Sequence, residues 1–162
     1  MASTAVEEYL QAIYTLADEN GHVVSARLAE RFLVEVLGFE WWKTHEEAER
    51  LEHAMSPEME ARMVRVLGDP QTCPHGNPMP GVTPAPTRPL DSLPRGERAV
   101  VRRIPDQFEH EAGFLEYLDS QGIRPGVAIE VVDRGPTLLK VSIDGTIRSL
   151  RPDCGQKVWM AA

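Results

Sequence analysis

The sequence lacks most of the features that would restrict its function at once. Its two cysteines, Cys73 and Cys154, are too few for a disulfide framework and favour a cytoplasmic location. No stretch approaches the roughly 18 uninterrupted apolar residues of a membrane-spanning helix, so we expect no membrane partner. The N-terminus, MASTAVEEYL, has no basic segment before an apolar core, so we expect no secretory signal. No paired nucleophile and base and no phosphate-binding loop is recognisable, and we expect a protein that is not an enzyme.

Positive charge is also scarce where nucleic-acid binding would need it. Residues 1–69 hold 14 Asp and Glu against 6 Lys and Arg, a net charge of −8, whereas residues 70–162 hold 11 of each and are neutral. Nucleic-acid binding normally leaves a basic surface, because neutralising phosphates supplies most of the affinity. The acidic first half therefore suits the binding of a cation better than the binding of DNA.

Helix signals dominate the first 69 residues. Apolar residues recur there at helical spacing, and capping boxes, a proline at a first helical position and terminal glycines mark where helices begin and end. The expected helices run from Thr4 to Asn20-Gly21, from Ser25 to Gly38, from Thr44, which forms a capping box with Glu47, through Met55, and from Ser56-Pro57 to Gly68.

The rest of the chain has a different character. Eight of the 13 prolines lie in residues 70–94, which have no helical or strand period and are expected to form a semi-rigid linker. Residues 95–162 contain short apolar runs with tight turns, including the type I′ hairpin signal Asp144-Gly145, and predict a small β-barrel. The expected strands are 99–104, 127–132, 138–143, 146–150 and 157–160, with one helix over Glu109–Leu118.

The most specific pattern is His45-x3-Glu49-x2-Glu52-His53. On a helix, these four side chains fall within about 100° of one another around the axis, so they share a face. Converging carboxylates and imidazoles suit a first-row divalent cation, and oxygen-rich ligation favours manganese or ferrous iron. The same pattern is also compatible with an ordinary solvated face, because the apolar residues between these positions account for the helix without a metal.

The first helix offers a second set of donors. Glu8 and Gln11 are spaced i,i+3, so they lie on one helical face. Packing of this face against the helix at residues 45–55 would allow Glu8 to complete the site. Composition and spacing by themselves leave open a two-part protein with or without that metal.

Four runs of sequence form a specific combination: EYLQAIYTL at 8–16, LVEVLG at 33–38, ERLEHAMS at 49–56 and PHGNPMPG at 74–81. The first resembles the first-helix motif of the diphtheria-toxin-repressor (DtxR/MntR) family of metal-responsive transcription regulators. The second and third resemble the dimerisation domain of that family, and the fourth resembles its linker. Residues 95–162 resemble the family's C-terminal SH3-like domain, which is related to the FeoA fold.

The resemblance implies an α+β protein. An all-α dimerisation and metal-binding region, with a truncated winged helix, would precede a small SH3-like (FeoA-like) β-barrel. The implied domains are a winged-helix remnant at 1–31, a helical dimerisation and metal-binding domain at 32–69, a proline-rich linker at 70–94 and the SH3-like domain at 95–162.

The resemblance also implies metal-binding roles by position. Glu8 stands where the family places its first-helix ligand, and Glu49 stands where iron sensors have cysteine and manganese sensors have glutamate. These hard donors favour Mn²⁺, with Fe²⁺ as the alternative. The implied primary ligands are Glu8, Glu49, Glu52 and His53, with Gln11 where manganese sensors can carry a glutamate; the implied ancillary ligands are His45 and Glu30, and Glu109 and His110 lie near where the C-terminal domain of iron sensors can contribute more.

One part of the family pattern is missing. The string RLAER at 27–31 is followed directly by the dimerisation helix from Phe32, without a recognition helix or wing between them. Family members carry a similar string twice, so we interpret the junction as a join between the two copies. A natural deletion, an engineered chain and an omitted segment would all give this sequence. The join leaves Ala26 where the second copy opens with a histidine ligand, which predicts weakened metal binding.

The implied function is that of a homodimeric regulator that depends on Mn²⁺ or Fe²⁺ and represses metal-uptake genes by binding operator DNA. Without a recognition helix, we expect this chain to bind operator DNA poorly. The alternative is a dimerisation and metal-binding module without DNA-binding activity, which forms heterodimers with a full-length regulator.

Overall fold

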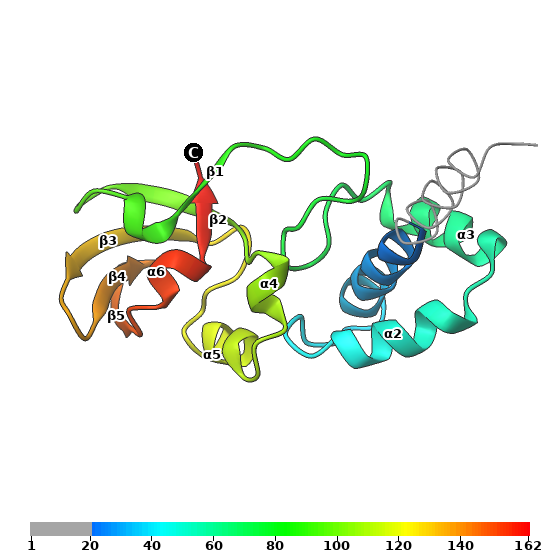
Figure 1. The fold of residues 1–162 in the computed structure, drawn as a ribbon, viewed down its shortest axis with the longest axis horizontal. Helices are drawn as coiled ribbons and strands as arrows, with labels where there is room; N and C mark the ends of the chain where they lie inside the picture. The colour runs from blue at the N-terminus through cyan, green and yellow to red at the C-terminus, as the bar shows by residue number, and fades with distance from the viewer. Residues whose placement is uncertain (1–20) are drawn as a thin grey trace, which may run out of the picture. The chain divides into compact units, whose positions relative to one another are not determined.

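The computed structural model describes residues 21–162, which divide into two compact units. Within the described residues, unit 1 contains 21–39, 44–73 and 79–82, and unit 2 contains 40–43, 74–78 and 83–162. Unit 1 is helical and unit 2 is built around a sheet, as Figure 1 shows. The expectation of a helical region followed by a small antiparallel β-structure is therefore confirmed.

Unit 1 is organised around a helix of residues 21–35. In Figure 1 this helix is blue and neighbours both α2 (His45–Ala54) and α3 (Pro57–Leu67). Leu28 packs with Met63 of α3, and Leu33 packs with Ala48 of α2. Burying one such leucine stabilises the fold by about 1.5–3 kcal/mol. Four of the buried positions of the helix recur at the spacing of a single face: Ser25, Leu28, Ala29 and Leu33; Glu30 is buried as well.

Helix α3 begins and ends where the Ser56-Pro57 and Gly68 signals predict. The Ser56 hydroxyl accepts a hydrogen bond of 3.2 Å from the Met59 N–H, and Pro57 occupies the first turn. Gly68 ends the helix in the left-handed region, with φ of 72°. Both caps are local, so they need no information from the rest of the fold.

The start of α2 differs from its prediction. Thr44 precedes the helix, but its backbone lies in the αR region and its side chain makes no capping hydrogen bond. The Thr44 Oγ1 is buried without a hydrogen-bond partner, and Glu47 accepts instead from Arg50 at 2.6 Å. A capping side chain normally requires an extended backbone, so the expected capping box does not form here.

The helix boundaries around residues 21 and 113 also correct the expectations. Gly21 is helical rather than a stop, and its helix, expected to begin at Ser25 and to end at Gly38, ends at residue 35. The single helix expected over Glu109–Leu118 is two helices, α4 (Asp106–Glu109) and α5 (Phe114–Ser120). Gly113 separates them because its φ of 73° is not helical.

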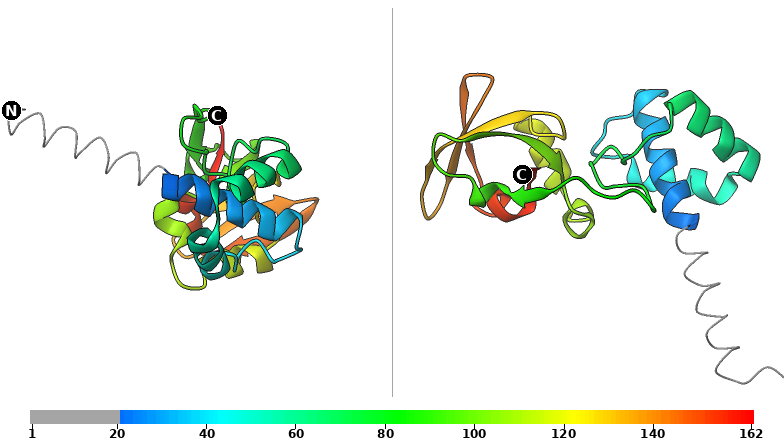
Figure 2. Two further views of the ribbon diagram at one scale, coloured as in Figure 1. Left: turned by 90° about the vertical axis from the view of Figure 1, so that its right-hand side faces the viewer. Right: turned by 90° about the horizontal axis from the view of Figure 1, so that it is seen from above.

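Unit 2 contains a six-stranded antiparallel sheet in the order β1-β6-β2-β3-β4-β5. The first half of β2 (Arg98–Arg103) pairs with β3 and its second half pairs with β6, with a register shift between Val101 and Arg103. Such irregularities bend a sheet, and Figure 2 shows the strands strongly curved. The remaining elements are β1 (Thr87–Pro89), η1 (Leu90–Ser92), β3 (Ala128–Arg134), β4 (Leu139–Ile143), β5 (Thr146–Leu150), α6 (Cys154–Lys157) and β6 (Trp159–Ala161).

Two segments of unit 2 test local signals directly. Asp144 and Gly145 have φ of 48° and 78°, as the type I′ hairpin between β4 and β5 requires. In the proline-rich segment, by contrast, residues 87–92 form β1 and η1 rather than a plain linker. Among residues 21–162, no helix is long and apolar enough to cross a membrane.

Candidate metal centre

A pocket of about 390 Å³ opens in unit 1, where the 21–35 helix faces the end of α2 and the start of α3. The pocket is large enough for an ion with several waters, since one water occupies about 30 Å³ of liquid. Two glutamates and two histidines contribute to its lining, which comprises Gly21, His22, Ser25, Glu52, His53, Met55 and Glu60.

His22 and Glu52 form a short contact in this pocket. His22 Nδ1 lies 2.5 Å from Glu52 Oε1. The His22 ring also meets the His53 ring edge-on, with ring centroids 6.5 Å apart. The Glu52 side chain is only 12% exposed, whereas that of His22 is 57% exposed. A largely buried carboxylate therefore contacts one solvent-exposed imidazole, and a second imidazole lies beside the first.

A third acidic side chain borders the same pocket. Glu60, on α3, accepts a hydrogen bond from the Ser25 hydroxyl at its Oε1. Carboxylate oxygens and imidazole nitrogens together are suitable ligands for manganese, ferrous iron and zinc. Burying carboxylates is costly unless a positive charge is near, so the donors of this pocket fit a divalent cation.

Two of the predicted primary ligands, Glu52 and His53, lie in this pocket. Glu49 lies one turn earlier on α2 with an exposed side chain and is not part of the pocket lining. Glu8 and Gln11 lie outside the described residues, so their roles stay predictions.

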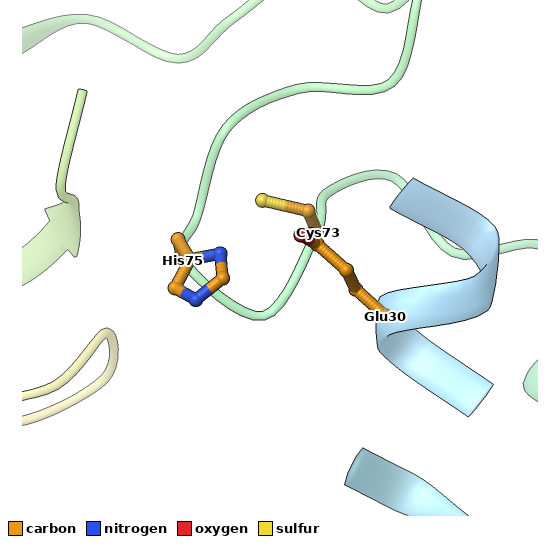
Figure 3. A group of neighbouring side chains, drawn as sticks. All are labelled: Glu30, Cys73 and His75. Carbon is orange, nitrogen blue, oxygen red and sulfur yellow. The ribbon is translucent and has the colours of Figure 1, made fainter. Parts of the chain in front are cut away.

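The predicted ancillary ligands Glu30 and His45 contact each other elsewhere in unit 1. The Glu30 carboxylate is buried, and its Oε1 lies 2.8 Å from Nδ1 of His45, the first residue of α2. The Cys73 thiol is also buried, and its sulfur lies within 4.8 Å of a Glu30 carboxylate oxygen. Figure 3 shows the Glu30 side chain extending from its helix toward Cys73. We call Glu30, His45 and Cys73 the second cluster.

Arg31 fixes the position of Cys73 in this cluster. Its Nε donates to the Thr72 carbonyl oxygen at 2.6 Å, and a terminal nitrogen donates to the Thr72 hydroxyl at 2.8 Å. Because Thr72 precedes Cys73 directly, and Arg31 follows Glu30 directly, this two-point contact aligns the thiol with the carboxylate. Charge-assisted bonds in a fixed fork geometry are suited to such alignment.

His75, which Figure 3 also labels, belongs to unit 2 and is held there by a separate network. Its Nε2 lies 2.8 Å from the Trp41 carbonyl oxygen, and its Nδ1 lies 3.3 Å from Glu109 Oε2. Asn77 donates to the Ile104 carbonyl oxygen at 2.7 Å and to the same Glu109 oxygen at 3.0 Å. The HGN run of the linker motif is thus a packed part of unit 2.

This network bears on the two ligands expected from the C-terminal domain. The Glu109 carboxylate is almost completely buried and is occupied by His75 and Asn77. His110 is mostly exposed, with its Nε2 3.8 Å from Glu109 Oε1. The contacts of Glu109 are sufficient to explain its burial, and a ligand role for either residue stays a prediction.

Sequence reasoning overlooked His22 and gave Cys73 no role. His22 lies outside the motif runs, but it precedes Ala26 by four residues, which places both on one helical face. That spacing was the available signal. Cys73 offered no comparable signal. It lies 43 residues after Glu30 in the sequence, and the two side chains come close only because the chain folds back on itself.

Comparison with known families matches almost all of the described chain. Residues 21–81 match the model of the iron dependent repressor metal-binding and dimerisation domain, and residues 88–161 match the model of the FeoA domain. The second match confirms the expected FeoA-like domain, and the first covers the helical unit that contains the pocket.

Curated relatives are repressors. The chain is 36% identical over 118 residues to the iron-dependent repressor IdeR of Mycobacterium tuberculosis, covering 65% of this chain and 51% of that protein. It is 45% identical over 119 residues to the diphtheria toxin repressor of Corynebacterium glutamicum, covering 66% of this chain and 52% of that protein. The chain therefore spans about half the length of the curated relatives it matches.

Solved structures cover more of the chain. A manganese-dependent transcriptional repressor in complex with manganese is 37% identical, with a TM-score of 0.77 over 88% of this chain and 70% of that one. Another manganese-dependent transcriptional repressor is 32% identical, with a TM-score of 0.75 over 97% of both chains. Iron-dependent and manganese-dependent repressors are thus both among the similar proteins.

Proposed function

Because this chain belongs to the diphtheria-toxin-repressor (DtxR/MntR) family of metal-dependent regulators, we propose that it binds Mn²⁺ or Fe²⁺ and acts in metal-dependent transcriptional regulation. The observation that carries the proposal is that Glu52 and His53, from one turn of α2, line a pocket in the unit that matches the metal-binding domain. Repression of metal-uptake genes in the cytoplasm is the role that best fits such a sensor.

The proposed ligands are Glu52 and His53, with Glu49 and Glu8 as further carboxylate donors and Gln11 as a neighbour of Glu8. A metal bound there would supply positive charge that joins the first helix to α2. Three carboxylates and an imidazole form a hard, oxygen-rich set, which favours Mn²⁺ and accommodates Fe²⁺. The Glu30–His45 pair would add an ancillary site in the same unit, with the Cys73 thiol near the Glu30 carboxylate.

Calorimetric titration of the full chain with Mn²⁺ tests the pocket. Loss of a residue that only hydrogen-bonds to a metal ligand typically weakens metal affinity by about 10–100-fold. We therefore expect Glu52→Gln and His53→Gln, which each remove a proposed ligand, to weaken Mn²⁺ binding by at least that much. Glu46→Gln is the matched control, because Glu46 lies on the same helix with its side chain 87% exposed. Unchanged binding in both pocket variants would rule out this site.

We further propose that the chain forms a homodimer through an apolar surface of unit 1. Large apolar side chains are exposed there at the end of the 21–35 helix and along α3, including Leu37 and Val66 at 55% and 64% exposure. A neighbouring groove of about 340 Å³ is lined by Phe32, Ser56, Glu58, Met59, Arg62, Met63 and Val66. Clustered exposed apolar surface of this kind is typical of an interface between subunits.

Sedimentation velocity measures this association directly. Val66→Glu should raise the dissociation constant of the dimer at least tenfold, since a charge buried in an apolar interface costs more than about 1.4 kcal/mol. Ile147→Glu in unit 2 is the control, because Ile147 is 55% exposed and lies on β5. Equal dissociation constants for the two variants would contradict the proposed interface.

A second candidate function rests on the charge distribution. Residues 1–69 carry a net charge of −8, which opposes the approach of a phosphate backbone. The chain could then serve as a dimerisation and metal-binding module that pairs with a full-length regulator. A gel shift with operator DNA and Mn²⁺ separates the two functions: specific binding supports the regulator itself, and its absence with retained metal binding supports the module.

A further inference from the structure

The 21–35 helix carries an imidazole one turn away from the position where the family resemblance places one. Ala26 occupies the expected ligand position, and its methyl group cannot bind a metal. His22 precedes it by four residues, and on a helix i and i+4 side chains lie on the same face. The structure directs His22 at Glu52, with 2.5 Å between Nδ1 and Oε1.

The contacts of His22 go beyond a surface ion pair. A pair with Glu52 alone would contribute little to stability, because the His22 side chain is mostly exposed. The His53 ring, however, meets the His22 ring at an angle of 61°, and both rings line the pocket that contains Glu52. Two imidazole rings that line one pocket beside a carboxylate are ordinary ligands of one shared cation.

The charges around the pocket agree with a cation at this point. Glu52 and Glu60 both contribute carboxylates, and Ser25 fixes the orientation of Glu60 through its hydroxyl. Helical contacts of Leu28 and Leu33 hold the 21–35 helix against α2 and α3, so the His22 backbone is anchored by the core rather than by its own side chain.

We infer that His22 is a ligand of the divalent cation that Glu52 and His53 hold, and that it supplies the imidazole which Ala26 does not. This inference rests on the proposed metal-binding function. It replaces the expectation that the primary site has one imidazole fewer than its relatives. The site would then still have an imidazole from this helix, supplied by His22 one turn before residue 26.

Two measurements on the full chain test a direct bond. In the first, Zn²⁺ is added while the ring nitrogens of the histidines are followed by ¹⁵N NMR. Binding should shift one ring nitrogen of His22 together with one of His53 at a stoichiometric amount of metal. No shift at His22 alongside a shift at His53 overturns the inference and leaves the proposed function standing.

In the second measurement, Mn²⁺ affinity is compared among variants by calorimetry. His22→Gln should weaken binding at least tenfold, by the same reasoning as for a lost ligand, whereas Val23→Gln should stay within twofold because Val23 is outside the pocket lining. The double variant His22→Gln with Ala26→His should recover most of the lost affinity, since it returns an imidazole to the same helical face.

The outcomes separate the two hypotheses. If His22→Gln binds Mn²⁺ as the unchanged chain does, or if the double variant shows no recovery, His22 is not a ligand. If Glu52→Gln and His53→Gln also bind normally, the pocket itself is not the metal site and the proposed function loses its main support.

Discussion

The substitution Gly76→Ala probes how the HGN segment packs inside unit 2. A Cβ atom at residue 76 would lie 1.9 Å from the Arg102 carbonyl oxygen and 2.8 Å from the Arg103 Cα. Both are backbone atoms, so neither can rotate away. The φ of +86° at residue 76 adds strain, because alanine rarely adopts that conformation.

The expected cost follows from these contacts. The strained backbone costs about 1–3 kcal/mol. Relieving the overlap moves residues 74–78 away from β2, which breaks the 2.9 Å bond from the Ile104 N–H to the His75 carbonyl and the 2.7 Å bond from Asn77 to the Ile104 carbonyl. Each hydrogen bond contributes about 0.5–1.5 kcal/mol, so unit 2 should lose roughly 2–6 kcal/mol of unfolding free energy.

Urea denaturation followed by tryptophan fluorescence measures this loss, because all three tryptophans, Trp41, Trp42 and Trp159, belong to unit 2. Gly135→Ala is the control: its φ is not positive, and its added Cβ would be 3.6 Å from the nearest atom. The control should change the unfolding free energy by less than about 0.5 kcal/mol. A loss below about 1 kcal/mol for Gly76→Ala would refute the close backbone approach.

Three further substitutions test other parts of the fold. Leu28→Ala should lower the unfolding free energy of unit 1 by about 2–5 kcal/mol, because Leu28 is buried among α3 residues. Urea denaturation followed by helical circular dichroism measures this loss. A smaller loss than that of Val23→Ala would contradict the placement of Leu28 in the core. Ser56→Ala should cost about 1 kcal/mol by the same measurement, because it removes the α3 cap, and a neutral result would contradict that cap. Hydrogen bonds from Arg151 and then Lys157 hold the pKa of the Asp153 carboxyl well below its ordinary value, so its contribution to stability is present above about pH 4 and is lost as pH falls further. Asp153→Asn should therefore cost about 1 kcal/mol at neutral pH, a figure reduced for solvent exposure, and the difference from the unchanged chain should shrink progressively as pH falls below about 4.

Local signals predicted the elements that depend on local chemistry. The bounds of α3 follow from Ser56-Pro57 and Gly68, and those of β5 follow from the type I′ turn before it. The strand β1 was not predicted, because Thr87–Pro89 forms a strand only through its pairing with β6 at the other end of the chain. The failed capping box at Thr44 has the same origin, since the backbone conformation there is set by the surrounding fold.

The candidate site shows the same division. Helical spacing predicted that Glu52 and His53 share a face, and they do line one pocket. Spacing alone could not show that His22, 30 residues earlier, meets Glu52, because that depends on the packing of two helices. Likewise, the sequence near Glu109 gave no sign that His75 and Asn77 would occupy its carboxylate.

The contact between Arg31 and Thr72 also has a consequence for folding. These residues are 41 positions apart, and the intervening chain contains both α2 and α3. Closing a loop of that length costs about 3 kcal/mol of chain entropy, so neither helix gains much until the whole loop has formed. We therefore expect the amides of the 21–35 helix, α2 and α3 to exchange with solvent together, as one cooperative folding unit.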